Sequence, residues 1–123
     1  MPMVTVTTNI EGKSIPEDFN AKLTYLLAES MNKPVNRIAV LLEAGARFTH
    51  GATFDPAVLV TIRSIGMVTA EDNIRHTEKV TKLCNDVLNV PSDKVVIEYF
   101  NLTPETVGFN GTTVAVANAN AQK

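Results

Sequence analysis

The sequence predicts an α/β (α+β) protein, in which a tandem β-α-β repeat forms one four-stranded sheet with two helices on one face. Segments rich in β-branched residues predict the strands, and two stretches with apolar residues at helical spacing predict the helices. The two halves of the chain also align with each other at offsets of 54 to 57 residues, so that Val4 corresponds to Val60 and Asn32 to Asn89. Each half is therefore expected to hold two parallel strands joined by a right-handed crossover.

The first half contains signals for a strand, a helix and a second strand. Alternation over 3–7 predicts the first strand. Ser14, followed by Pro16 and acidic residues, indicates the start of a helix. The expected buried face of this helix consists of Phe19, Leu23, Leu26, Leu27 and Met31. Pro34 is expected to end it, and the apolar run within 37–42 predicts the second strand.

The second half repeats this order of elements. A third strand is expected over 58–65, and it stops at Gly66. Thr69 is the expected N-cap of a second helix. The expected buried face of that helix consists of Ile74, Val80, Leu83, Cys84, Val87 and Leu88. A fourth strand is expected over 94–100, and the turn-rich segment 102–117 has room for one or two short strands.

Length and composition favour one globular domain over 2–117, followed by a frayed tail over 118–123. The net charge of −2 argues against nucleic acid as the main partner. The apolar runs are too short to cross a membrane, and the N-terminus lacks a basic region followed by an apolar core, so neither membrane insertion nor a signal peptide is expected. A single cysteine and two isolated histidines predict no metal site and fit a reducing compartment.

The predicted arrangement leaves one face of the sheet without a covering layer. Both helices are expected on the opposite face, because each crossover of a β-α-β unit packs back onto the sheet with the same hand. Apolar side chains on the uncovered face need a partner, so an oligomer is expected.

Pro2 is the first candidate for a catalytic role. Removal of Met1, which is efficient before a small residue, would leave Pro2 with a free secondary amine directly ahead of the first strand. An α-amino group has a reference pKa of about 7.7–8.0, and burial or a nearby lysine lowers it further. Such a group suits general acid–base catalysis near neutral pH. The alternative is that Pro2 only marks an efficiently processed N-terminus.

Several segments together resemble one known family. They are Pro2-Met3, Lys33-Pro34, His50-Gly51, Ser64-Ile65-Gly66 and Val107-Gly108-Phe109-Asn110. At these spacings, and over about residues 2 to 115, the chain resembles the macrophage migration inhibitory factor and D-dopachrome tautomerase family of the tautomerase superfamily. Its segment 69–73 is similar to invertebrate members and to the D-dopachrome branch. The resemblance implies a homotrimer of β-α-β-β-α-β subunits, with an active site at each subunit interface around the N-terminal proline.

The resemblance also implies an activity. Family members are keto–enol tautomerases that need no cofactor, of the phenylpyruvate tautomerase and L-dopachrome isomerase type, so Pro2 would move a proton on a small α-keto/enol acid or a dopachrome-like substrate. Members also act outside cells as cytokine-like ligands of cell-surface receptors and leave the cell without a signal peptide, which implies both a cytoplasmic and a secreted location. The alternatives are a receptor-binding ligand with weak or vestigial tautomerase activity, and a purely structural trimer.

Five substrate-binding residues follow from the resemblance by position. Lys33 matches the lysine that holds the substrate carboxylate and lowers the pKa of the catalytic amine; the alternative is a solvated lysine at a helix C-terminus. Arg37 matches the D-dopachrome branch and would add a second positive charge, unless it is a surface residue at a strand start. Ile65 would offer its backbone to the substrate, or serve only in the core. Val107 and Phe109 match pocket-wall positions, and core packing is the alternative for Phe109.

Two residues of the fourth predicted strand depart from the family pattern. Val96 and Glu98 stand where the inhibitory-factor pattern has a tyrosine and an asparagine that reach the site from the neighbouring subunit. The exchange removes an aromatic wall and a hydroxyl group, and it would bring a negative charge near an anionic substrate. Turnover of phenylpyruvate or dopachrome is therefore expected to be altered or weak.

The cysteine and the histidines are expected to have no catalytic role. The Cys-x-x-Cys motif of the inhibitory-factor branch is replaced by Ala-Val-Leu-Val at 57–60, so no thiol oxidoreductase activity is expected. Cys84 is expected to be a small buried hydrophobic residue. His76 is expected at the surface or near the helix cap, and His50 is expected to be structural.

Overall fold

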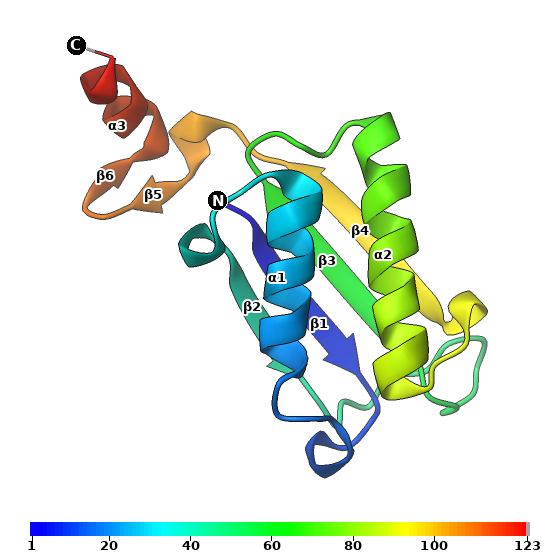
Figure 1. Cartoon of the computed structure of the whole chain (residues 1–123). Helices are drawn as coiled ribbons and strands as arrows, with labels where there is room; N and C mark the ends of the chain where they lie inside the picture. Colours follow the sequence, from blue (N-terminus) through cyan, green and yellow to red (C-terminus); the bar gives the residue numbers. More distant parts are fainter. Residues whose placement is uncertain (123) are drawn as a thin grey trace.

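The computed structural model describes residues 1–122, and Lys123 lies outside the described residues. Two long helices, α1 (Phe19–Met31) and α2 (Ala70–Leu88), cover one face of a four-stranded sheet (Figure 1). The strand order of this sheet is β2-β1-β3-β4. Its strands are β1 (Met3–Thr8), β2 (Ala39–Glu43), β3 (Val58–Ser64) and β4 (Val95–Asn101). The predicted sheet with two helices on one face is confirmed.

The pairing of the strands confirms the predicted β-α-β units. β1 runs parallel to β2, and β3 runs parallel to β4, so each unit contains a parallel pair. The two units meet along β1 and β3, which are antiparallel and place Thr5 opposite Thr61. Because these two threonines are also equivalent in the sequence repeat, an approximate two-fold axis passes through their pair and relates the two units.

The sequence repeat is visible in the way the two long helices end. Asn32 follows α1 and Asn89 follows α2, and both adopt the left-handed conformation with φ of 52° and 56°. Asparagine tolerates this conformation better than most residues, so it is a common C-terminal signal. Each asparagine is followed two residues later by a proline that opens a short 3₁₀ turn leading into a strand. These turns are η2 (Val35–Arg37) and η3 (Ser92–Lys94).

The core lies between the helices and the sheet. Apolar residues at alternate strand positions and at helical spacing on α1 fill it, as predicted. The fully buried members include Val4, Val6, Val58, Val60, Ile62, Phe19, Leu23, Leu27 and Met31. On α2 the expected burial of Val80, Cys84 and Leu88 is confirmed. The prediction for Ile74 is wrong, because it is 63% exposed; it lies two residues, or about 200° around the helix axis, before the buried His76.

The first long helix begins later than predicted. Ser14 lies in a separate 3₁₀ turn, η1 (Gly12–Ser14), and α1 starts only at Phe19, after Asp18 at the N-cap. The cause is Ile15, which has an extended backbone and is only 7% exposed. Its burial in the core requires a straight segment between the turn and the helix, so Ser14 does not cap α1.

The segment after β4 contains the short strands that the sequence allowed. A 3₁₀ turn, η4 (Pro104–Thr106), leads to an antiparallel hairpin of β5 (Gly108–Phe109) and β6 (Thr112–Thr113). The hairpin lies beyond the end of the main sheet and away from the two long helices (Figure 1). Along the chain it follows the end of β4, and Arg37 of η2 contacts its Phe109 ring.

A short helix, α3 (Val114–Ala121), follows the hairpin directly. Its N-cap is Thr113, whose hydroxyl accepts a hydrogen bond from the Val116 N–H at 3.2 Å. The structure thus includes residues 118–121 of the expected frayed tail in a helix, while Lys123 lies outside the described residues. None of the α3 residues is buried, so its sequence of valine, alanine and asparagine contains no pattern of core positions from which to predict it.

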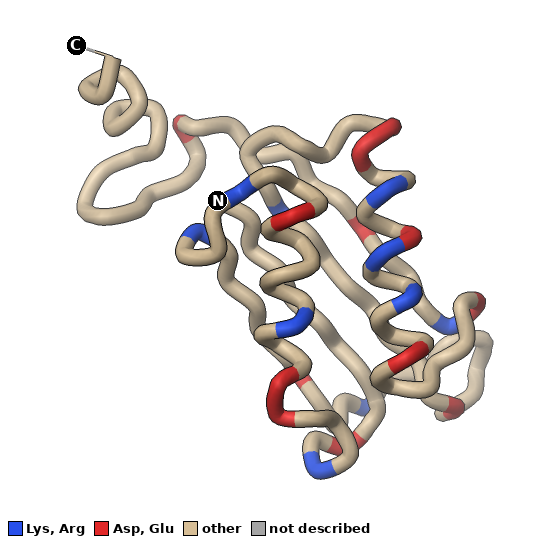
Figure 2. Tube along the Cα trace, viewed as in Figure 1, with Lys and Arg blue, Asp and Glu red and all other residues tan. Residues whose placement is uncertain are grey.

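The surface of the chain carries residues of both charges and includes the sheet face that the helices leave open. Figure 2 shows that positively and negatively charged residues are interspersed along α2. Within residues 1–122, none of the helices combines the length and the apolar character that a membrane crossing requires. On the sheet face opposite the helices, Leu41, Val96 and Phe100 are exposed by 56%, 43% and 44%. This face is thus uncovered within one chain and presents large apolar side chains, as expected, although Glu43 and Glu98 lie on it as well.

Thr69→Ala tests the capping of α2. The Thr69 hydroxyl accepts from the Asp72 N–H at 3.1 Å, so its loss leaves a helix-terminal N–H without this partner. We expect the free energy of unfolding to fall by about 1 kcal/mol in urea denaturation followed by circular dichroism. Thr113→Ala, which removes the equivalent cap of α3, is the matched control and should hardly move the midpoint, because α3 buries no residue. An equal loss in both variants would contradict this account.

Candidate active site

The topology of the sheet brings four segments of the chain together at one end of the sheet, along the direction of its strands. β1 begins at this end, and its antiparallel neighbour β3 ends there, with Met3 opposite Arg63. β2 also begins there, and the Ala39 N–H donates to the Pro2 carbonyl at 3.1 Å. β4 runs parallel to β3 and therefore finishes at the same end, where it leads to the hairpin with Phe109. The candidate residues of distant segments thus meet at the start of β1.

Lys33 reaches from the end of α1 to the end of β3. Its Nζ donates to the Ile65 carbonyl at 3.1 Å, and the side chain is half-buried. The backbone behind it is fixed, because Asn32 is left-handed and the Lys33 N–H donates to the Ala28 carbonyl at 3.0 Å. The geometry therefore favours a positioned cation over the freely solvated lysine of the alternative interpretation, and it brings Lys33 and Ile65 together.

The N-terminal amine lies within the electrostatic reach of two cations. Burial lowers the pKa of the Met1 α-amino group, and the charges of Lys33 and Arg37 lower it further. Pro2 is itself buried, and its carbonyl is tied to the start of β2 by Ala39. Loss of Met1 would therefore move the free amine by one residue into a segment that the sheet already holds in place.

Arg37 and the hairpin form a second side of this region. The guanidinium carbon of Arg37 lies 4.9 Å from the centre of the Phe109 ring, which is a cation–π arrangement. The same guanidinium approaches the Met1 sulfur at 3.8 Å. Val107 is buried, and its carbonyl accepts from the Val114 N–H at 2.9 Å, which joins the hairpin to α3. Phe109 is 42% exposed, so it forms a wall at the surface and is not a core residue.

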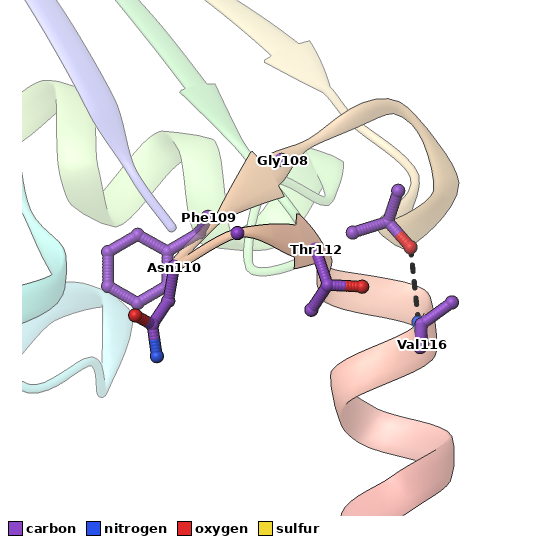
Figure 3. Close-up of a pocket in the computed structure, with 7 residues that line it drawn as sticks. Gly108, Phe109, Asn110, Thr112 and Val116 are labelled. Carbon is purple, nitrogen blue, oxygen red and sulfur yellow. Dashed lines mark hydrogen bonds between the residues drawn. The ribbon is translucent and has the colours of Figure 1, made fainter.

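Two hollows adjoin the hairpin. One, of about 230 Å³, is lined by Arg37, Phe109, Asn110, Thr112, Val114, Ala117, Asn118 and Ala121. The other, of about 500 Å³, is open to solvent and is lined by residues of 108–116; Figure 3 shows its Phe109 and Thr112 side chains pointing in different directions from the hairpin. Neither lining includes Lys33 or Ile65. One chain alone therefore does not enclose the lysine.

Val96 and Glu98 are not brought to this region within one chain. On β4 they lie opposite Leu59 and Thr61 of β3, away from the end of the sheet where β1 begins. Both are exposed, in alternation with the half-buried neighbours that face the helices, so they belong to the uncovered face of the sheet. They can reach a site of this kind only across an interface between subunits.

His76 is buried, and the expectation that it lies at the surface is wrong. It is 0% exposed, with Nδ1 2.6 Å from the Ser30 hydroxyl oxygen and Nε2 2.7 Å from the Met67 carbonyl oxygen. A signal for this burial was present in the sequence, because His76, Val80 and Cys84 recur at intervals of four along one helix face. A histidine inside such an apolar series is a core position that requires hydrogen-bond partners.

The surroundings of Cys84 and His50 are those of structural residues. Cys84 is buried, and burial raises the pKa of its thiol to about 11, so the thiol stays protonated at neutral pH. The carbonyl of His50 accepts from Lys94 Nζ at 2.8 Å, and its N–H donates to the Thr53 carbonyl, which is a structural role. Among residues 1–122, the structure contains no group of three or more side chains of the usual metal-binding types.

The two joined β-α-β units form an α+β fold of the tautomerase type, and comparisons with known proteins agree with it. The family described as "Macrophage migration inhibitory factor (MIF)" matches residues 1–115. The chain is 58% identical to MIF-like protein mif-2 of Caenorhabditis elegans, over 96% of this chain and 98% of that protein. It is 36% identical to macrophage migration inhibitory factor of Rattus norvegicus, over 94% of this chain and 100% of that protein.

A solved structure gives the same result. The macrophage migration inhibitory factor of Trichinella spiralis superposes with a TM-score of 0.87 and 31% identity, and the match covers 90% of this chain and 98% of that one. The chain belongs to the macrophage migration inhibitory factor family. The match to the family model ends at residue 115, inside α3.

Lys33→Ala tests the electrostatic coupling at the N-terminus. Removing a cation that penalises the protonated amine should raise the pKa of the N-terminal amine. The measurement is the rate of acylation of this amine as a function of pH, with the site of modification read by mass spectrometry. Lys22→Ala, within α1 and paired with Asp18 at 3.5 Å, is the matched control and should leave the pKa unchanged. The same pKa in all three proteins would disprove the coupling.

Proposed function

We propose that this protein, once Met1 is removed, is a cofactor-free keto–enol tautomerase of the phenylpyruvate tautomerase or L-dopachrome isomerase type, with the Pro2 amine as its acid and base. The observation that carries this proposal is the position of the N-terminus at the end of the sheet where β1 begins, where burial and the charges of Lys33 and Arg37 lower the pKa of the Met1 α-amino group. Membership of the macrophage migration inhibitory factor family supports it.

The proposed reaction is a 1,3-proton shift that one basic amine can carry out. In ketonisation the enol O–H loses its proton, the oxygen electron pair closes the C=O bond, and the C=C pair takes up a proton at the neighbouring carbon. A neutral secondary amine accepts the first proton and, as the ammonium, returns a proton to carbon. An amine with a pKa close to the working pH serves both steps. The reaction therefore requires no oxidant, no reductant and no bound cofactor.

The surrounding residues suit a small anionic substrate. The Lys33 ammonium has three N–H donors and gives one to Ile65, so the others remain for a substrate carboxylate. Arg37 adds a second positive charge and stacks on Phe109, which together with Val107 is proposed to form the wall against the apolar part of the substrate. These roles are the ones assigned by resemblance, and the contacts at this end of the sheet support them.

We further propose a homotrimer as the active assembly. Leu41, Val96 and Phe100 on the uncovered sheet face are large, apolar and exposed, and burial against other subunits would remove them from water. A neighbouring subunit would also place its Val96 and Glu98 near the Pro2 amine, since neither reaches it within one chain. The apolar side chain of Val96 and the negative charge of Glu98 would then affect which substrates bind. Glu98 would repel an anionic substrate.

A second role, as an extracellular ligand of a cell-surface receptor, is favoured by the names of the relatives, which describe macrophage migration inhibitory factors. The proposal includes a cytoplasmic pool and export without a signal peptide. Both roles are compatible with one trimer, because a receptor would contact its outer surface while the substrate occupies the interface sites. If the correctly processed trimer is inactive on both test substrates, the ligand role becomes the leading proposal.

Pro2→Gly tests the catalytic amine. We expect untagged protein, with removal of Met1 verified by mass, to ketonise enol-phenylpyruvate and to convert a dopachrome methyl ester. The variant keeps a free N-terminus but replaces the rigid secondary amine by a primary one, and its kcat/KM should fall at least about 100-fold, within the usual range for an acid–base group. A matched control is Pro16→Gly, at an exposed position outside the site. Equal activity of parent and Pro2→Gly would refute the proposed mechanism.

Glu98→Gln tests the contribution of the neighbouring subunit. Removing a negative charge close to the substrate carboxylate should raise kcat/KM for phenylpyruvate by about 3- to 10-fold, as expected for a partly screened charge pair. The kcat/KM for the dopachrome methyl ester, which has no carboxylate, should be nearly unchanged. Glu43→Gln, an exposed change on the same sheet face at the other edge strand, controls for net charge. If both changes act alike, or both substrates respond equally, Glu98 does not face the site.

A further inference from the structure

His76 connects the two chain segments that carry Lys33 and Ile65. It is fully buried on α2, and each of its ring nitrogens lies against a different segment. Nδ1 is 2.6 Å from the Ser30 hydroxyl oxygen in the last turn of α1, three residues before Lys33. Nε2 is 2.7 Å from the carbonyl oxygen of Met67, two residues after Ile65. The His76 ring thus bridges the end of α1 and the loop after β3. The Lys33–Ile65 hydrogen bond joins the same two segments.

The chemistry of the two contacts defines the state of the ring. A carbonyl oxygen only accepts, so Nε2 carries the proton and donates to Met67. Nδ1 is then a lone-pair acceptor for the Ser30 hydroxyl. Burial lowers the pKa of His76, which favours the neutral imidazole that this bonding pattern requires. Both nitrogens are therefore satisfied without a charge in the core.

The end of α1 is held by α2 at a second point. The Ser30 carbonyl belongs to the last turn of the helix, where carbonyls lack a partner within the helix. It accepts from Arg75 Nε at 3.3 Å and from Nη2 at 2.9 Å, and Arg75 is itself paired with Asp72 at 3.0 Å. Hydroxyl and carbonyl of one serine are thus bound by adjacent residues of α2, which fixes the start of the Lys33 segment.

The loop after β3 needs such an anchor. Gly66 and Met67 both have positive φ, of 77° and 61°. For any residue other than glycine, the left-handed conformation is unfavourable in free energy. Met67 therefore adopts it only because surrounding contacts impose it. His76 holds the Met67 carbonyl, and Asn73 of the same helix donates to the Val68 carbonyl at 3.2 Å. The Gly66 N–H, which shares a peptide group with the Ile65 carbonyl, donates to Asn101 Oδ1 at 3.1 Å. Together with this bond, the contacts from α2 hold the loop that carries the Ile65 carbonyl.

We propose that His76 is a positioning residue that sets the distance between the Lys33 ammonium and the Ile65 carbonyl, and so places Lys33 for the carboxylate of an anionic α-keto acid. The proposal rests on the tautomerase function proposed above. It assigns His76 no contact with the substrate, since the imidazole is buried and uses both nitrogens within the protein.

The test uses two substrates that differ in the group that Lys33 would bind. His76→Leu removes both hydrogen bonds at similar volume. We expect it to raise the KM for enol-phenylpyruvate about tenfold and to leave kcat within about threefold, while the KM for a dopachrome methyl ester, which has no carboxylate, stays within about twofold. His76→Gln retains a donor for the Met67 carbonyl and should recover part of the loss.

Two controls separate positioning from general support of the fold. Val80→Ala, one turn further along α2, creates a defect in the same core and should lower the melting temperature without affecting the two substrates differently. In a Lys33→Ala background, His76→Leu should add no further rise in KM for phenylpyruvate, because the group through which it acts is gone. Equal effects on both substrates, or full additivity with Lys33→Ala, would overturn the proposal.

The outcomes remain informative if a variant or the activity fails. Should His76→Leu not fold, Ser30→Ala, which loses only the hydroxyl, must show the same substrate selectivity to a smaller degree, and equal effects would overturn the proposal. Should the parent lack tautomerase activity, the proposed function fails by itself. Positioning is then read from the acylation pH profile of the N-terminal amine, which His76→Leu should shift in the same direction as Lys33→Ala; no shift would overturn it.

Discussion

The antiparallel pairing of β1 with β3 is the constraint on which the rest of the molecule depends. It joins two parallel β-α-β units into one sheet, and it brings the beginning of one strand to the end of the other. If the two units had met in parallel, the N-terminal amine and the Ile65 carbonyl would lie at opposite ends of the sheet. Since the register is fixed by valine and isoleucine residues that alternate toward the helices, the same pattern that builds the core also assembles the candidate site.

The approximate two-fold symmetry shows how a repeated fold carries a single site. The position equivalent to Lys33 is Val90, which is only 1% exposed and packs in the core, whereas Lys33 is half-buried and reaches a carbonyl oxygen. The position equivalent to Pro2 is Val58, inside the chain, where no free amine exists. One copy therefore kept apolar packing at the two places where the other has a cation and a terminus. The candidate site therefore lies where the repeat departs from symmetry.

The elements that obey a strong period were predictable from the sequence, and those governed by tertiary packing were not. Alternation in β1 and β3, and the Thr69 cap of α2, placed these elements within a residue or two. The start of α1 was misjudged, because burial of Ile15 overrides the local capping signal of Ser14. His76 was misjudged because a polar residue in an apolar series is acceptable only if partners exist, and Ser30 and Met67 become its neighbours only after folding.

The candidate site was predictable as a set of residues and not as a geometry. Resemblance named Lys33, Arg37 and Phe109 together, but the stacking of Arg37 on Phe109 depends on the hairpin, whose position relative to η2 no local pattern encodes. Val96 and Glu98 illustrate the opposite limit, since their strand was predicted correctly and yet one chain leaves them far from the N-terminus. Whether Val96 and Glu98 reach the candidate site depends on the proposed interface between subunits, which the sequence of one chain does not specify.

An anionic substrate would offset part of the effect that Lys33 and Arg37 have on the pKa of the N-terminal amine. In the free protein, Lys33 and Arg37 disfavour the ammonium form, so more of the N-terminal amine is neutral and ready to accept a proton. In the proposed reaction, a bound carboxylate would offset part of that positive field and raise the pKa of the amine, which makes it a stronger base when the substrate is in place. A basic pair close to a base would thus keep the amine deprotonated until an anion arrives, and the binding of that anion would itself strengthen the base.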